Sequence, residues 1–257
     1  MHRRSFIRSS LAVTAATFDH TVAGAKDPVQ KEIYEWREYE TRFGGDQKQL
    51  ENYLKTALIP ALNKYGVKPV GVFKEWRPSD PARIYVLTPY ASIENYLSVN
   101  AKVKADAAYL ENSAAYRNIP VEKAAYSRFT STLLAAFDGF PKLVSPAGEA
   151  RMFELRTYEG YSEDAVRRKI KMFHDGEFPI FERAKLNPVF CGEVIAGDRM
   201  PRLTYMITCS SMEERDKGWT AFLADPEWKK LVSDPQYANT ISKISNVFLV
   251  PVSFSQV

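Results

Sequence analysis

Two stretches of the sequence decide the fold: IYEWREYE at residues 33–40 and MFELRTYE at residues 152–159. Both alternate apolar and polar side chains with the period of two that is typical of a β-strand. They lie 119 residues apart, and the same offset continues along the chain from residue 35 to residue 109. It aligns Pro60 with Pro179, Pro69 with Pro188, Arg83 with Arg202, Ser92 with Ser211, Asp106 with Asp225 and Tyr109 with Trp228. A register held without gaps over this length indicates a duplicated domain.

Each copy has the order strand, helix, strand, strand, helix, strand, which is typical of the ferredoxin-like βαββαβ unit. We expect strands at residues 33–40, 69–76, 83–88 and 125–137, and at residues 152–159, 189–195, 202–209 and 244–252. Helices cover one face of such a sheet and leave the other face in need of a partner. The sequence therefore predicts an α+β fold in which two tandem repeats form an intramolecular dimeric α/β barrel. The first repeat is expected at residues 30–138, a linker at 139–149 and the second repeat at 150–257.

Local signals place the helices within each repeat. Ser162, Ser211 and Asp225 are expected N-caps, since each precedes a run suited to the first turn of a helix. Pro60 and Pro179 occupy the same column inside the first helix of their repeats, and proline lacks the N–H that a helix interior requires. We therefore expect a kink or a break at both prolines.

The first 25 residues have the features of an export signal. Arg3 and Arg4 form a twin-arginine pair, a short apolar stretch follows, and Ala23-Gly24-Ala25 fits a small-residue cleavage site. Cleavage there would start the mature chain at Lys26, in the periplasm or outside the cell. A mitochondrial transit peptide is the alternative, because the stretch is rich in Arg and Ser, although Asp19 and the cleavage site count against it.

Composition excludes several classes of protein. The apolar fraction of 45%, the charged fraction of 26% and the spread of 12 Gly and 15 Pro are those of an ordinary globular domain. The net charge is +4, and it falls to +2 without residues 1–25. A nearly neutral chain gives no electrostatic reason to expect nucleic acid as a partner. No stretch reaches the length of an integral membrane segment.

Alternation on the two first strands suggests where chemistry could lie. Trp36 is on one face and Glu35, Arg37 and Tyr39 are on the other, and the second copy repeats this pattern. If the apolar face meets the helices, the polar side chains point into the barrel lumen, where Arg could hold a carboxylate. The candidate ligand-binding residues in the lumen are Glu35, Arg37, Tyr39, Glu154, Arg156, Tyr158, Glu193 and Tyr205. The alternative is that each Arg is neutralised by its neighbouring Glu as buried structural polarity.

Histidine and cysteine limit other kinds of site. His174 is the one histidine that remains after residue 25, so a catalytic triad or a multi-histidine metal site has little to build on. His174 is a weak candidate for a haem ligand, and a surface histidine is the simpler interpretation. We therefore predict no metal and no cofactor. Cys191 and Cys209 are equally distant from residue 200, so they could face each other across a hairpin or stay as two free thiols.

The second repeat resembles the NIPSNAP family of the dimeric α/β-barrel superfamily. The resemblance rests on FELRTY at residues 153–158, Gly192-Glu193, RLTYM at 202–206, SMEERDKGW at 211–219 and ADPEW at 224–228. The first repeat is a degraded copy, with Asn95-Tyr96 where the second has Glu214-Arg215, so a site built on that helix would exist once. The resemblance implies the barrel fold and little chemistry. Bacterial members are largely uncharacterised, and eukaryotic relatives resemble mitochondrial proteins of trafficking and quality control.

Three functions are compatible with these observations. The first is an exported protein that binds a small molecule in the barrel lumen. The second, suggested by the resemblance to barrel enzymes, is a cofactor-free or haem-linked oxygenase, with Tyr158 or His174 in the reaction. The third is a protein-interaction module that uses the outer helices. The sequence also leaves a homo-oligomer open, and it does not show whether the chain is an enzyme.

Overall fold

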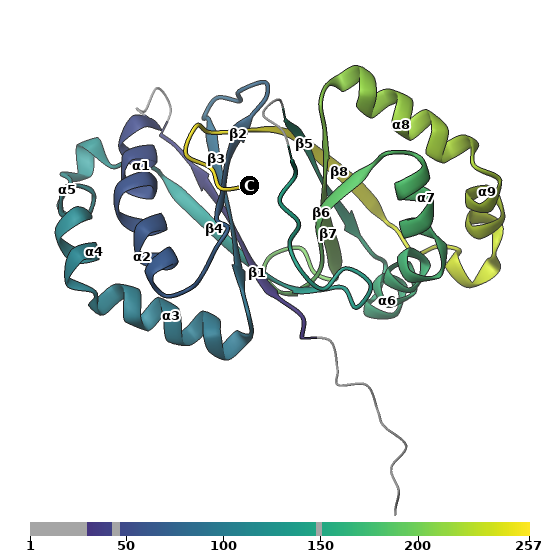
Figure 1. Ribbon diagram of the computed structural model, residues 1–257, viewed down its shortest axis with the longest axis horizontal. Coiled ribbons are helices and arrows are strands. Elements are labelled where there is room, and N and C mark those ends of the chain that lie inside the picture. The colour runs from purple at the N-terminus through teal and green to yellow at the C-terminus, as the bar shows by residue number, and fades with distance from the viewer. Residues whose placement is uncertain (1–29, 43–46, 148–150) are drawn as a thin grey trace, which may run out of the picture.

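The computed structural model describes residues 30–42, 47–147 and 151–257. Within these ranges, antiparallel strands close into a barrel in the order β1-β3-β2-β8-β5-β7-β6-β4. Figure 1 shows the strands crossing the centre of the molecule, with the helices of the first half on one side and those of the second half on the other. The predicted α+β barrel, formed within one chain, is confirmed.

Each half contributes four neighbouring strands to the barrel. The first half supplies β1 (Ile33–Glu40), β2 (Gly71–Glu75), β3 (Arg83–Tyr90) and β4 (Arg128–Ala136), and the second half supplies β5 (Met152–Glu159), β6 (Asn187–Ala196), β7 (Arg202–Cys209) and β8 (Lys243–Pro251). The alternation predicted β1, β5 and β7 at the observed bounds. The remaining strands begin or end a few residues from the expected positions, because turns and bulges rather than alternation decide where they stop.

Two seams join the halves. The last strand of the second half, β8, pairs with β2, and Lys74 lies opposite Val250. The last strand of the first half, β4, pairs with β6, and Leu134 lies opposite Val194. Each half therefore closes the open sheet edge of the other, which leaves no unpaired edge in the barrel.

The helices pack on the outer surface of the barrel. The first half has α1 (Gln47–Tyr53), α2 (Ile59–Lys64), α3 (Ile93–Ala105), α4 (Ala107–Asn112) and α5 (Ala114–Arg117), and the second half has α6 (Glu163–Met172), α7 (Phe178–Arg183), α8 (Met212–Ala224) and α9 (Pro226–Ser233). The predicted caps are confirmed. Ser162 accepts a hydrogen bond from the backbone N–H of Ala165, Ser211 accepts one from Glu214, and Asp225 accepts from Glu227 and Trp228.

The predicted irregularity at the two prolines takes the form of a π-helical turn. Residues Leu54–Leu58 lie between α1 and α2, and Phe173–Glu177 lie between α6 and α7, at the same columns of the repeat. The backbone N–H of Ile59 bonds to the oxygen of Leu54, and that of Phe178 bonds to Phe173, five residues back. The wider turn precedes each proline, whose ring would clash with the carbonyl four residues earlier in a regular helix.

The centre of the barrel lumen is apolar, and a small cavity with polar side chains lies at one end of it. The candidate tyrosines point outward to the helices, which corrects the prediction that they point into the lumen. Trp36 and Leu155 belong to a buried cluster inside the barrel with Tyr34, Phe73, Tyr85, Phe153, Phe190, Met206 and Leu249. Tyr39 packs instead with the helices of the first half, and Tyr158 and Tyr205 pack with those of the second. Alternation separates the two faces of a strand without saying which face is inside. An eight-stranded barrel is narrow enough for side chains to fill it, so the more apolar face lies inward.

The duplication is uneven in its last strand. Tyr34 pairs with Leu134, whereas the equivalent Phe153 pairs with Leu249, so the offset falls from 119 to 115 residues. The connection between α3 and β4, which contains α4 and α5, is therefore four residues longer than the connection between α8 and β8, which contains α9.

Other sequence predictions concern the thiols and the N-terminus. Cys191 lies opposite Tyr205 and Cys209 lies opposite Met152, so the two do not face each other across the hairpin, and both are free. The proposed export signal at residues 1–25 lies outside the described residues. Across the part of the chain that the structure describes, no helix is long and apolar enough to cross a membrane.

Candidate functional site

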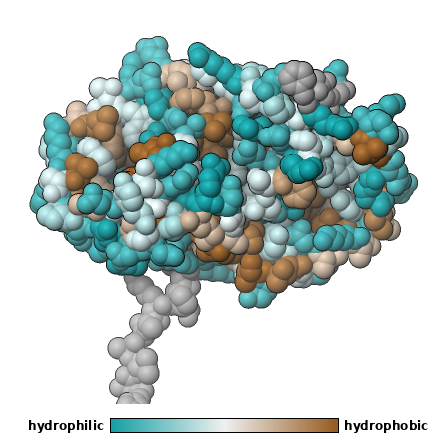
Figure 2. Space-filling view, turned by 180° about the vertical axis from the view of Figure 1, so that it is seen from behind, coloured by the Kyte–Doolittle hydropathy of each residue, from teal (hydrophilic) through white to brown (hydrophobic). Residues whose placement is uncertain are grey.

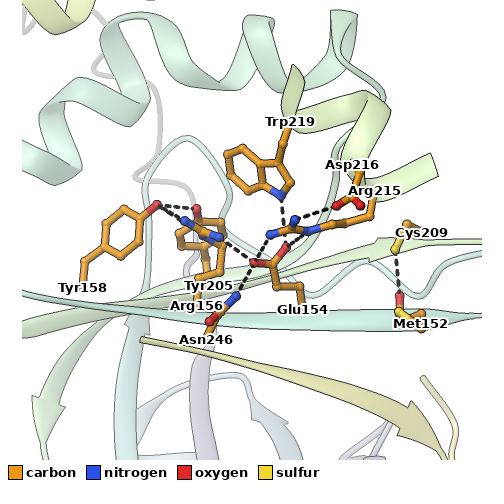
Figure 3. Close-up of polar contacts among 10 residues, drawn as sticks. All are labelled: Met152, Glu154, Arg156, Tyr158, Tyr205, Cys209, Arg215, Asp216, Trp219 and Asn246. Carbon is orange, nitrogen blue, oxygen red and sulfur yellow. Dashed lines mark hydrogen bonds and ion pairs between the residues drawn. The ribbon is translucent and has the colours of Figure 1, made fainter. Parts of the chain in front are cut away.

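A buried carboxylate, Glu154 on β5, organises the polar cluster of the second half (Figure 3). Its side chain is 0% exposed and accepts hydrogen bonds from four residues. One oxygen accepts from Arg156 Nη1 at 2.5 Å, Arg215 Nη2 at 2.9 Å and Asn246 Nδ2 at 3.0 Å. The other accepts from Arg215 Nε at 2.8 Å and Trp219 Nε1 at 3.0 Å. Glu154 therefore joins β5, β8 and α8 through a fully satisfied carboxylate.

This environment keeps Glu154 ionised. Burial alone would raise the pKa of a carboxyl group, but the hydrogen bond from Arg215 and the charge of Arg156 outweigh it. Together with Asn246 and Trp219 they lower the pKa of Glu154 to about 2.

Arg156 extends the cluster to two tyrosines. Its Nε and Nη2 donate to the Tyr158 hydroxyl at 3.3 and 3.2 Å, and that hydroxyl lies 2.8 Å from the Tyr205 hydroxyl. Either tyrosine can be the donor in this bond. The two hydroxyl groups carry two hydrogens and share one bond, so one hydrogen of the pair is left to donate. Burial raises the pKa of Tyr205, so the group stays protonated.

Arg215 reaches this cluster from α8, on the opposite side of the pocket from the sheet. Its side chain is 19% exposed and makes a two-point contact with Glu154. Helix α8 also packs closely against the end of α7, since a Cβ on Gly218 would lie 2.9 Å from the carbonyl oxygen of Ala184. The sequence pattern around Arg215 is that of a solvated helix face. The signal that could have found it is the change from Tyr96 to Arg215 between the repeats.

A pocket of about 480 Å³ opens beside this cluster, between the outer face of β5 and β7 and helices α6, α8 and α9. Arg156, Arg215, Tyr158 and Tyr205 form part of its wall. Most of the remaining wall is apolar or aromatic: Met172, Trp219, Phe222, Leu223, Trp228, Val232, Ile241 and Ile244. Figure 2, which shows the molecule from behind, has small hydrophobic patches within a largely hydrophilic surface.

A second ion pair lies in the pocket wall. Lys169 of α6 donates a hydrogen bond to Glu177, the last residue of the π-helical turn, and the two side chains are 5% and 3% exposed. The Lys169 ammonium also lies 5.0 Å from the ring centre of Phe173 and 5.6 Å from that of Trp228. Burial raises the pKa of Glu177, in contrast to Glu154. Sequence reasoning missed this pair. Its signal is the first repeat, which has Leu50 and Leu58 in the same columns.

The first half keeps the polar triad but encloses it differently. Glu35 accepts hydrogen bonds from Arg37 Nε at 2.6 Å and Ser131 Oγ at 2.7 Å, and Arg37 donates to Tyr39 at 3.4 Å. Aromatic side chains occupy the space beneath the helices. The rings of Tyr53 and Tyr116 stack with their centres 3.8 Å apart, and the Tyr53 hydroxyl lies 3.0 Å from the Tyr109 hydroxyl. Buried Leu50 and Leu58 stand in place of the ion pair.

Two further sequence candidates lie apart from the pocket. Glu193 is exposed on β6 and is not part of the pocket wall. His174 accepts a hydrogen bond at Nε2 from the backbone N–H of Gly139 at 3.2 Å, and its ring packs against Phe137 and Phe178. A haem iron would bind that nitrogen, which already accepts the Gly139 hydrogen bond, so His174 does not fit the role of a haem ligand. In the described ranges, no group of three or more His, Cys, Asp or Glu could hold a metal ion.

Comparison with known proteins bears on the half that contains the pocket. Residues 153–256 match the NIPSNAP family model. The second half is a NIPSNAP domain. This NIPSNAP domain contains Glu154, Arg156, Lys169, Glu177 and Arg215, so the pocket and the three ion pairs among these residues lie within the matched residues. No curated protein matches the chain.

Solved structures share the fold across both halves. A Lactobacillus acidophilus protein provisionally named a monooxygenase has a TM-score of 0.56 at 9% identity, over 86% of this chain and 94% of its own. A Fusobacterium nucleatum protein of the same provisional name has a TM-score of 0.55 at 12% identity, over 87% and 93%. An anthrone oxidase-like protein has a TM-score of 0.51 at 11% identity, over 88% and 93%. At these identities the likeness is one of fold alone.

Proposed function

We propose that the NIPSNAP domain of this chain binds a small molecule with an apolar body in the pocket between β5, β7 and helices α6, α8 and α9. The ligand site is thus outside the barrel and in the second half only. Apolar side chains fill the centre of the lumen, and the cavity at one end of it, of about 140 Å³, is much smaller than this pocket.

One observation carries this proposal: the two halves build the same helix with different side chains. The first half places buried Leu50 and Leu58 where the second places Lys169 and Glu177. Burying two charges costs more solvation than an apolar pair of similar volume, and buried ion pairs seldom add stability. The fold therefore does not require the ion pair, and its position in the wall of a pocket supports a role in binding.

The size and lining of the pocket support the same proposal. Its volume of about 480 Å³ lies within the usual range of small-molecule sites. Its walls combine aromatic and aliphatic side chains with a few polar groups, as is typical of such sites. Leu223, 59% exposed, stands at its edge, and an exposed apolar residue at a pocket mouth suits an apolar ligand body.

A dye titration tests the proposal. We expect 1-anilinonaphthalene-8-sulfonate to bind the folded protein with a stoichiometry of about one and a rise in fluorescence. Leu223→Trp, which narrows the mouth of the pocket, should weaken this binding. Leu97→Trp is the matched control, because Leu97 is 62% exposed on α3, the counterpart of α8 in the first half. Equal loss in both variants, or no saturable binding by the wild type, would contradict the proposal.

An oxygenase is a second candidate, favoured by the provisional names of two structural neighbours that share the barrel over both halves. Since His174 is already engaged, we propose the cofactor-free form only. It predicts oxygen consumption when the protein turns over a pocket ligand, with a lower rate in Leu223→Trp than in Leu97→Trp. A pocket ligand that binds and leaves unchanged, without oxygen uptake, would contradict it.

A further inference from the structure

Two buried carboxylates lie near the same pocket, and they are held in opposite ways. Glu154 accepts hydrogen bonds from Arg156, Arg215, Trp219 and Asn246. Within the described residues, the hydrogen bond that the structure shows to Glu177 comes from Lys169. An incoming anion would have to break five hydrogen bonds to displace Glu154. It would break far fewer to displace Glu177.

The cations of the pocket differ in the same way. Arg156 and Arg215 direct their guanidinium groups to Glu154, Tyr158 and Asp216. Lys169 is a pocket-lining ammonium whose shown polar contacts are Glu177 and the sulfur of Met172, at 3.4 Å in the latter case. Of the three, Lys169 is therefore the cation that can exchange its partner at the lowest cost.

The tyrosine hydroxyls add a neutral hydrogen-bond donor to the pocket wall. Hydrogen-bond counting leaves the Tyr158–Tyr205 pair, in the pocket wall, with one hydroxyl hydrogen that the bond between the two does not use. Lys169 and this tyrosine pair both offer hydrogen atoms, so a group that only accepts hydrogen bonds, such as an acid anion, fits between them. The apolar walls then accommodate an alkyl or aryl body.

We propose that an acid-headed apolar ligand displaces Glu177 from Lys169, and that Glu177 takes up a proton from solvent as it is displaced. This inference rests on the proposed function, because it names the ligand class of that pocket. The ligand anion becomes the partner of the Lys169 ammonium, and the proton neutralises the carboxylate that is left behind. The ligand brings one negative charge and the proton brings one positive charge, so the net charge of the pocket does not change.

The surroundings of Glu177 favour proton uptake over a bare charge. Lys169 of α6 and Arg156 of β5 stabilise its ionised form, and Tyr205 of β7 and Cys191 of β6 are the other titratable groups whose charge it influences. Once Lys169 turns to the ligand, burial dominates, and burial already raises the pKa of Glu177 in the free protein. The displaced carboxylate is thus neutralised by a proton more readily than it is left ionised.

The test uses decane-1-sulfonate below its micelle-forming concentration, with decan-1-ol as the uncharged control. A sulfonate stays ionised at all relevant pH values, so any proton taken up on binding belongs to the protein. Calorimetry at pH 8 in two buffers of different ionisation enthalpy should give an uptake of about one proton per bound sulfonate. Difference infrared spectra should show the carbonyl band of a protonated carboxylic acid. Glu177→Gln should remove this band, and Lys169→Met should weaken sulfonate binding about tenfold or more.

Each other outcome has a distinct meaning. Sulfonate binding without proton uptake and without the acid band would overturn the exchange and leave the pocket as a binding site. A band that persists in Glu177→Gln would overturn the assignment to this residue. Binding of decan-1-ol but not of the sulfonate would overturn the acid-headed class and the exchange with it, and would leave the pocket as a binding site. If neither probe binds the wild type, the proposed function fails, and the exchange fails with it.

Discussion

At the scale of single residues, the number of hydrogen-bond donors decides how a buried glutamate behaves. Glu154 has Arg156, Arg215, Trp219 and Asn246 around it, and its pKa falls to about 2. Glu177 faces Lys169, and burial raises its pKa. The same side chain in the same half of the molecule thus has a lowered pKa at one position and a raised pKa at the other. Such a separation of pKa values is typical of sites at which two carboxyl groups have different roles.

Glu154→Gln should destabilise the fold by about 2–3 kcal/mol at neutral pH, because it leaves the partly buried Arg156 and Arg215 without their anion. The effect depends on pH. Since the pKa is lower in the folded state, the carboxylate stabilises the protein fully above about 4.5, its ordinary value, and the contribution is lost as the pH falls to about 2. Urea unfolding at several pH values should show wild type and variant converging over this range. Glu213→Gln, at an exposed position, is the control. A gap that stays constant with pH would contradict the assignment.

Residue-level prediction from sequence succeeded in part. Glu154, Arg156, Tyr158 and Tyr205 do meet, because the register of β5 and β7 brings Arg156 opposite Tyr205. The face on which they meet was wrong, since alternation alone does not identify the inner face of a barrel. Glu193 was expected beside them, but it is exposed on β6.

At the scale of elements, the π-helical turns show how one backbone serves two purposes. Both halves widen the helix before Pro60 or Pro179. In the first half the turn ends on buried Leu58, and in the second it ends on Glu177, which is part of the pocket wall. Position in the sequence predicted an irregular helix at both prolines. It did not predict the Lys169–Glu177 contact, because the residues lie eight apart and a regular helix would set them at a different angle.

The leucine pair of the first half suggests a test of the Lys169–Glu177 pair in the second half. Glu177→Leu alone should cost about 3–5 kcal/mol of folding stability, because it leaves the Lys169 ammonium buried without a partner. Adding Lys169→Leu should restore stability to the wild-type value or above it, since the two leucines recreate the pair found at Leu50 and Leu58. Urea denaturation of the three proteins measures both steps. A double variant no more stable than the single variant would contradict this interpretation.

At the scale of the whole molecule, the barrel is a dimer built within one chain. Seams β2–β8 and β4–β6 enclose a cluster of apolar side chains inside the barrel to which both halves contribute. The sequence repeat predicted this arrangement because a duplicated sheet with one uncovered face pairs most simply with its own copy. The repeat could not predict that aromatic rings occupy the space beneath the helices of the first half, because this depends on how Tyr53, Tyr109 and Tyr116 pack.

A separated second half should therefore restore the barrel by pairing with itself. We expect residues 151–257, produced alone, to form a two-fold dimer in which β8 of each copy pairs with β6 of the other, because a monomer would expose Phe153, Leu155 and Leu249. Size-exclusion chromatography with light scattering measures the mass. Substituting Leu155→Glu in this fragment should prevent dimerisation. A well-folded monomeric fragment would contradict the expectation.

Export remains a prediction of the sequence. If residues 1–25 direct twin-arginine transport, the mature protein in its own host begins at Lys26, and Arg3→Lys together with Arg4→Lys keeps the precursor inside the cell. Intact mass spectrometry of the fractionated host distinguishes the two forms. An uncleaved chain in the cytoplasm of the wild type would contradict export.

The location of the ligand is tested most directly by a crystal structure of the full chain grown with decane-1-sulfonate. We expect the sulfonate beside Lys169 and Tyr205, the decyl chain against Trp219, Phe222 and Trp228, and no equivalent molecule beneath the helices of the first half. A decyl chain inside the barrel, among Trp36, Leu155 and Val247, would contradict a pocket outside the lumen.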